Sequence, residues 1–279
     1  MPLYVSTANP PASLDAASAL DAIAAWGCSH ALVVPGRMPG PHFQAEGERW
    51  DGRLALTHGC LEAPGEPWNL ADRDEALRKR SVSRTMETLR LAASLGCPFV
   101  ALEPAHALDG GRPIAGRQPR PGADETKALD QLCRSLDVLA SQADTLGLAL
   151  YMKNGALGAA LWQQPEGIER TLDRLGAPPI GLLLDVGHAL IASHARRYEP
   201  EPVVEAMAPF ARAVAVSRND GRQPLRLAPV ENGVELTLAR LAGGARLPVL
   251  IDTAGLDRPR LEEAVGLLEE ALKAEAPPA

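Results

Sequence analysis

Short apolar runs alternate with longer amphipathic stretches along the chain. Each run has the length of a β-strand, and eight can be placed, at Leu3–Ser6, Ala31–Val34, Leu54–Thr57, Pro98–Leu102, Gly147–Met152, Ile180–Asp185, Ala213–Val216 and Pro248–Ile251. Several of the intervening stretches space their apolar residues at the helical period. These predict helices at Ser13–Trp26, Arg73–Leu95, Asp124–Leu146, Pro165–Leu175 and Arg258–Leu272. The pattern is therefore one of strands that are mostly followed by helices.

The sixth strand indicates how the sheet is built. Leu182, Leu183 and Leu184 follow one another without the alternation of a half-exposed strand, so this strand is expected to be buried on both faces, as in a parallel sheet covered by helices. Eight such strands, with no Pro- or Gly-rich linker dividing the chain, predict an α/β fold with one (β/α)8 TIM-barrel domain over residues 1–279. An open doubly wound sheet is the alternative, but no Gly-x-Gly-x-x-Gly loop follows the first strand.

Composition and charge narrow the classes of partner. The chain has 279 residues, of which 46% are hydrophobic and only 4% aromatic, so its core should be mainly aliphatic. The net charge of −7 provides no basic footprint for nucleic acid or for an anionic membrane. The four cysteines are scattered and are expected to be reduced thiols, and no leader or spanning segment is evident. We therefore expect a cytoplasmic protein that acts on a small molecule. The sequence indicates no oligomeric state.

Polar side chains follow the ends of the last six strands, where an α/β barrel gathers its functional groups. They are His58, Glu103, Lys153, Asp185 with His188, Ser217 with Asp220, and Asp252. Asp with His is a natural pair for holding a metal ion or moving a proton. Asp185 could equally serve as the cap of the turn that follows its strand. Because the eight strand ends of a barrel meet at one mouth, we expect these side chains to lie close together.

Several stretches of the chain resemble the xylose isomerase-like TIM barrels, a superfamily of sugar and sugar-phosphate isomerases and epimerases, inosose dehydratases and endonuclease IV. The stretches are Thr57-His58, Trp68-Asn69-Leu70-Ala71, Arg80-Ser81, Leu95–Val100, Leu148–Gly155, Ile180–Leu190, Ser217–Asp220 and Pro248–Asp252. The closest match is Asp185-Val-Gly-His188-Ala189, where the superfamily has Asp-x-Gly-His-Ala after a strand. The resemblance implies a barrel with a sugar-like substrate at its mouth. Endonuclease activity is disfavoured, because this acidic chain lacks several of the metal ligands that such enzymes need.

The resemblance also assigns four positions to a divalent metal, and this chain departs from them. In the isomerases and epimerases Glu, Asp, His and Glu hold the ion at the ends of strands five to eight, and the matching residues here are Lys153, Asp185, Ser217 and Asp252. An ammonium group has no lone pair and repels a metal ion, and Ser is a poor replacement for an imidazole ligand. We therefore expect no metal and no other cofactor, with the Lys153 ammonium in the space of the ion and carboxylates around it.

Three functions are compatible with such a mouth. The first is a sugar isomerase or epimerase, with Glu103, Lys153, Asp185, His188 and Asp252 as the catalytic groups. The second is a Schiff-base aldolase or dehydratase that uses Lys153 as an amine. The third is a non-catalytic barrel that binds a sugar-like ligand or a protein partner without turnover. In each case we expect substrate contacts from a second group of mouth residues, namely His58, Trp68, Asn69, Ser217 and Asp220.

Overall fold

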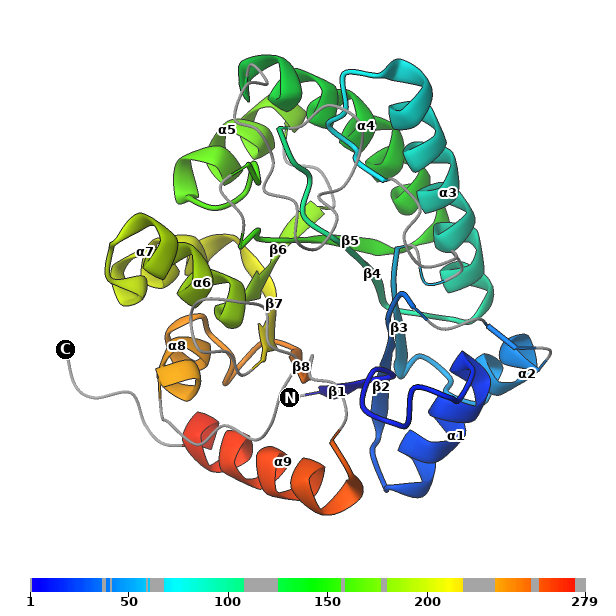
Figure 1. Cartoon of the computed structure of the whole chain (residues 1–279). Helices are drawn as coiled ribbons and strands as arrows, with labels where there is room; N and C mark the ends of the chain where they lie inside the picture. The colour runs from blue at the N-terminus through cyan, green and yellow to red at the C-terminus, as the bar shows by residue number, and fades with distance from the viewer. Residues whose placement is uncertain are drawn as a thin grey trace.

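Eight parallel strands form a closed barrel in the computed structural model (Figure 1). The structure describes residues 2–36, 39–40, 42–58, 60, 68–107, 125–156, 159–176, 180–217, 234–251 and 256–273. The strands follow one another around the barrel in chain order, and β1 pairs with β8 as well as with β2, which closes the sheet. They are β1 Leu3–Ser6, β2 His30–Val33, β3 Leu54–Thr57, β4 Phe99–Leu102, β5 Ala149–Lys153, β6 Ile180–Asp185, β7 Ala211–Val216 and β8 Val249–Ile251. The predicted (β/α)8 fold is confirmed.

Helices surround the barrel on its outer side (Figure 1). They are α1 Ala16–Ala25, α2 Phe43–Glu48, α3 Glu75–Ser94, α4 Glu125–Leu146, α5 Pro165–Leu175, α6 Val186–Arg196, α7 Pro200–Met207, the 3-10 helix η1 Ala208–Phe210, α8 Val234–Leu241 and α9 Arg258–Lys273. The five predicted helices are present, with ends shifted by at most three residues. The structure adds α2, α6, α7 and α8. No helix of the described residues is both long and apolar enough to cross a membrane.

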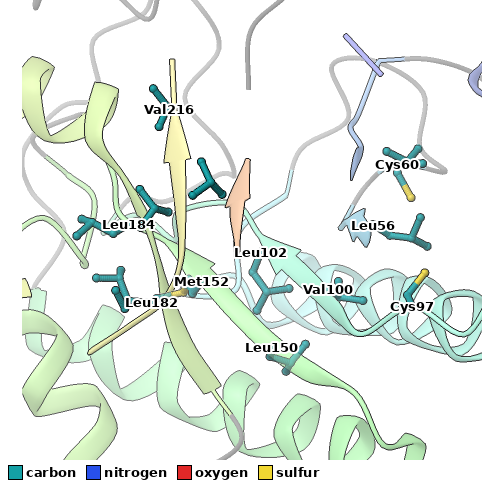
Figure 2. Close-up of a cluster of buried hydrophobic side chains, with 14 of the residues drawn as sticks. Leu56, Cys60, Cys97, Val100, Leu102, Leu150, Met152, Leu182, Leu184 and Val216 are labelled. Carbon is teal, nitrogen blue, oxygen red and sulfur yellow. The ribbon is translucent and has the colours of Figure 1, made fainter. Parts of the chain in front are cut away.

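The two faces of the sheet carry different side chains. Outward-facing strand residues such as Val100, Leu150 and Leu182 pack against the helices in a large aliphatic cluster, part of which Figure 2 shows. The inward-facing residues form a second, smaller cluster: Tyr4, Leu32, Val34, Ala55, Phe99, Ala101, Leu183, Ala213, Ala215 and Leu250. Both faces are therefore buried, as the absence of alternation in β6 predicted.

Aromatic rings fill the lower part of the barrel interior. The ring centroid of Tyr4 lies 4.9 Å from that of His30 and 5.3 Å from that of Phe99. The ring centroids of Phe99 and Tyr151 are 4.7 Å apart. His30 opens β2, so its ring lies at the end of the barrel opposite the strand tips that carry the polar residues. The other members of the interior cluster are alanine, valine and leucine side chains. The extent of the domain over residues 1–279 stays a prediction.

The period of two along each strand explains which residues enter the mouth. On β4 the inward-facing residues Phe99 and Ala101 are followed two positions later by Glu103, and on β5 Tyr151 is followed by Lys153. By the same step Leu183 on β6 leads to Asp185, and Ala215 on β7 leads to Ser217. The alternation therefore aims Glu103, Lys153, Asp185 and Ser217 toward the same opening.

Candidate active site

Lys153 lies between two carboxylates at the mouth of the barrel. Its Nζ is 3.6 Å from Oε1 of Glu103 and 3.6 Å from Oδ2 of Asp185. The side chains of Lys153 and Asp185 are 7% and 2% exposed, whereas that of Glu103 is 17% exposed. Three neighbouring strands thus contribute one ionic cluster, and Glu103 is its most accessible member.

Asp185 caps a helix and contacts the lysine at the same time. Its Oδ1 accepts a hydrogen bond from the His188 backbone N–H at 3.0 Å, which makes it the N-cap of α6. Its Oδ2 is the oxygen nearest to Lys153. The capping interpretation of the Asp-x-Gly-His motif is therefore confirmed, and the second carboxylate oxygen is left to face Lys153.

Asn154, which the sequence did not single out, joins the ends of β5 and β6. Its Oδ1 accepts from the Asp185 N–H at 2.6 Å, and its Nδ2 donates to the Asp185 carbonyl oxygen at 3.0 Å. The last residue pair of the β5–β6 ladder is Lys153 with Leu183. The buried amide side chain therefore takes the place of a backbone partner for Asp185, one step beyond the regular pairing.

The His188 side chain contacts the same two residues, Asn154 and Asp185. Its Nδ1 lies 2.8 Å from the Asn154 carbonyl oxygen and 3.9 Å from Oδ2 of Asp185. A carbonyl oxygen can only accept, so Nδ1 carries the hydrogen. The side chain is 18% exposed, and within the described part of the chain its Nε2 has no hydrogen-bond partner.

His58 and Trp68 form a stacked pair beside Glu103. The ring centroids are 3.7 Å apart with an angle of 23° between the planes, and both side chains are buried. The backbone N–H of Glu103 donates to Nδ1 of His58 at 2.9 Å, so the ring proton of the neutral imidazole is on Nε2. The indole N–H of Trp68 is buried with no hydrogen-bond partner among the residues that the structure describes. These two predicted substrate contacts thus lie close to the ionic cluster.

Asn69 makes structural contacts. Its Oδ1 accepts from the backbone N–H groups of Ala71 and His106, each at 3.1 Å, and its Nδ2 donates to the His106 carbonyl oxygen at 2.8 Å. The side chain is fully buried. These bonds tie the segment before α3 to the segment after β4. They supply no support for the predicted substrate contact.

Of the remaining predicted residues, Ser217 is the one that lies in the described part of the chain. Ser217 directly follows β7 and is half-buried. Asp220 and Asp252 lie outside the described residues. Within the described ranges, no group of three or more His, Cys, Asp or Glu side chains is placed to hold a metal ion.

Comparison with known proteins agrees with this architecture. The structure matches a D-tagatose 3-epimerase-like protein with a TM-score of 0.75 and 17% identity, over 98% of this chain and 97% of that one. It matches D-psicose 3-epimerase in the presence of D-fructose (TM-score 0.73, 15% identity, 98% and 100% coverage) and L-ribulose 3-epimerase (0.72, 14%, 97% and 94%). Such low identities show the fold alone. No curated protein matches the sequence.

A sequence model of one family also matches the chain. The family is described as xylose isomerase-like TIM barrel, and the match covers residues 51–241. That range holds Glu103, Lys153, Asp185 and His188 and includes five of the eight strands, β3 to β7. The chain therefore belongs to the xylose isomerase-like TIM barrel family.

Proposed function

We propose that this chain is a sugar isomerase- or epimerase-like protein that works at the barrel mouth with the Lys153 ammonium in place of a metal ion. The similar solved structures include epimerases of tagatose, psicose and ribulose type, which supports a small sugar-like substrate. The observation that carries the proposal is the position of Nζ, 3.6 Å from one oxygen of each of two carboxylates.

The residues present do not fit the metal site that the family resemblance implies. One of its four positions is Lys153, whose ammonium group has three donors and no lone pair. Another is Ser217, a weak ligand for Mn²⁺, Co²⁺ or Zn²⁺ compared with imidazole. The Lys153 ammonium group next to Asp185 already compensates the negative charge of that carboxylate, and it would repel a divalent ion placed beside it. We therefore derive no step through a metal.

Isomerisation or epimerisation requires removal of a proton from a carbon beside a carbonyl group. Glu103 is suited to accept that proton, because it is the more exposed of the two carboxylates. Negative charge then develops on the carbonyl oxygen, and a fixed ammonium group at Lys153 stabilises it. Asp185 is almost fully buried and caps α6, so its role is to hold Lys153 in place. Return of the proton from Glu103 to the neighbouring carbon, while the proton of the hydroxyl group there moves to the enolate oxygen, completes an isomerisation. An epimerisation is completed only when a proton reaches the opposite face of the same carbon.

The position of Lys153 argues against the Schiff-base alternative. Attack on a carbonyl requires the neutral amine, whereas two carboxylates at 3.6 Å favour the charged ammonium. Borohydride reduction separates the two chemistries, because it traps an imine on Lys153 as a stable adduct. We expect no adduct with any ketose that the protein binds.

Hydrogen exchange in deuterated water tests the proposal. Ketoses and aldoses, free and phosphorylated, are incubated with chelator-treated protein, and loss of the proton next to the carbonyl is followed by NMR. We expect exchange with at least one of these substrates, no increase on addition of Mn²⁺ or Co²⁺, and a fall of at least about 100-fold in the Glu103→Gln variant.

A surface variant controls for the loss of charge. Lys153→Met should abolish exchange, whereas Lys79→Met removes a lysine that is 69% exposed on α3 and should leave it unchanged. Exchange that depends on added metal would overturn the metal-free mechanism. Binding of a sugar without any exchange would overturn the catalytic function.

A further inference from the structure

We propose that Asn154 is a positioning residue that fixes the tautomer of His188, so that the neutral imidazole presents the Nε2 lone pair at the mouth. The tautomer and its cause rest on described contacts alone. Only the use of that lone pair, which is to accept the proton of a sugar hydroxyl, rests on the proposed function. The role differs from that of the catalytic groups, because Asn154 acts through the histidine.

The first step concerns the imidazole itself. Two bonds orient residue 188, since its backbone N–H donates to Oδ1 of Asp185 and its Nδ1–H donates to the Asn154 carbonyl oxygen. In a neutral imidazole, the hydrogen bond that one ring nitrogen makes decides which of the two nitrogens carries the proton. Here the acceptor is a carbonyl, so the proton is fixed on Nδ1 and the lone pair remains on Nε2.

The second step concerns the acceptor. The Asn154 carbonyl lies beyond the last ladder pair of β5 and β6, where its own N–H reaches the Leu183 carbonyl only at 3.4 Å. The side chain supplies the missing constraint, because both amide atoms bond to the peptide groups of Asp185. Removal of that amide would leave a buried N–H and a buried carbonyl without these partners, which costs about 1–3 kcal/mol each and frees the two strand ends to separate.

The third step is the contrast with the other imidazole near the mouth. His58 accepts the Glu103 N–H at Nδ1, so its ring proton is on Nε2. A second proton on His58 would break that bond, whereas protonation of His188 at Nε2 breaks none of its described bonds. The two rings are therefore fixed in opposite tautomers. The two imidazoles therefore present different Nε2 groups, a lone pair in His188 and an N–H donor in His58.

Long-range ¹H–¹⁵N NMR of protein labelled with ¹⁵N-histidine measures the tautomers without any need for substrate or turnover. The signals are assigned with His188→Gln and His58→Gln variants at a pH where the imidazoles are neutral. In the wild-type protein we expect the Nδ1–H form for His188 and the Nε2–H form for His58. In Asn154→Ala the His188 signal should move to a mixture in which at least half is the Nε2–H form.

Asn69→Ala is the matched control. Asn69 is also a fully buried asparagine whose side chain bonds to backbone groups of another segment, so its loss should destabilise the fold comparably. It should leave the His188 signal unchanged. Asn154→Asp, which keeps the acceptor for the Asp185 N–H and loses the donor, supplies a milder variant if the alanine variant does not fold.

The outcomes separate this inference from the proposed function. An Nε2–H tautomer for His188 in the wild-type protein overturns the inference, as does a tautomer that is unchanged in a folded Asn154 variant. If the tautomers are as expected but no sugar exchanges its proton, the positioning role stands and the proposed function fails.

Discussion

At the scale of single residues, Lys153 should be the residue on which the mouth depends for stability. Lys153→Met leaves the buried Asp185 carboxylate without its ammonium neighbour, and an uncompensated buried charge costs about 3 kcal/mol. Adding Asp185→Asn should recover part of that loss, because the amide can still cap α6 without a charge. Chemical denaturation of the single and double variants measures both effects. Lys79→Met, which breaks an exposed pair with Glu75, is the control and should cost at most about 0.5 kcal/mol. An equal cost for the two single variants would contradict the prediction.

Tyr4 should make the protein sensitive to alkali. Burial in the barrel interior, with smaller contributions from Cys97 and Tyr151, raises the pKa of Tyr4 from 10.0 to about 12. Between these values the unfolded chain has lost the proton and the folded chain still holds it, so stability is full below pH 10 and falls as the pH rises toward 12. The slope is about 1.4 kcal/mol per pH unit. Burial also raises the pKa of Cys97 to about 12, so the wild-type curve contains both losses.

The difference between wild type and Tyr4→Phe isolates the tyrosine. Denaturant unfolding from pH 8 to 11.5 should give a constant difference up to about pH 9.5, and the variant should then lose less stability with each further step. Parallel curves for the two proteins over the whole range would show that the phenol of Tyr4 is not buried in the way the structure places it.

At the scale of elements, the turn after β5 depends on a glycine. The Gly155 N–H donates to the Trp162 carbonyl oxygen at 3.0 Å, and a Cβ on Gly155 would overlap the Cβ of Ala160. Gly155→Ala should therefore cost about 1–3 kcal/mol in thermal or chemical unfolding. It should cost much less when added to Ala160→Gly, which removes the overlapping atom.

A second glycine serves as the reference for that prediction. Gly266 is exposed on α9 with no neighbouring atom near its Cβ position, so Gly266→Ala should stabilise the protein by about 0.5–1 kcal/mol. A clash at Gly155 is excluded if Gly155→Ala costs the same with and without Ala160→Gly.

Strands were predictable from the sequence, and several helices were not. Most strands are apolar runs that end at or just before a polar residue, and burial on both faces makes such runs continuous. Helix α6 was missed because it begins at Val186, directly after the strand, and because Gly187 in its first turn has a low helix propensity. Helix α7 is short and begins at Pro200, and α2 is shorter still with Gly47 inside it. Helices of that length carry too few turns for a clear period.

At the scale of the whole molecule, closure of the barrel made the ionic cluster predictable. Once eight strands are placed, their ends must meet, so the proximity of Glu103, Lys153 and Asp185 follows from topology. The histidine tautomers and the role of Asn154 do not follow from it. They depend on which backbone carbonyl or N–H faces each side chain where the ladder ends, and no residue pattern records that geometry. The buried backbone bonds of Asn69 were hidden for the same reason.

The response of global stability to metal ions should distinguish this chain from a metal-holding relative. A ligand that binds only the folded state raises the midpoint of thermal unfolding. Because Lys153 and Ser217 are unsuited to bind a divalent ion, we expect no shift of the wild-type midpoint with Mn²⁺, Co²⁺ or Zn²⁺ at millimolar concentration. The double variant Lys153→Glu with Ser217→His supplies the two missing ligand types beside Asp185. After treatment with a chelator, the metal-free double variant should melt below wild type, because the carboxylates of Glu103, Asp185 and the new Glu at position 153 then lie together and repel one another.

Added metal should restore the double variant by about 5 °C or more, since a concentration 100 times Kd contributes about 2.7 kcal/mol. Elemental analysis should find about one ion per chain in that variant. Lys79→Glu, with the same charge change on an exposed face of α3, is the control and should show neither the loss nor the rescue. The ammonium-centred site would be disproved by a wild-type protein that retains stoichiometric metal after purification and melts lower once it is removed, because Lys153 could not then occupy the place of the ion.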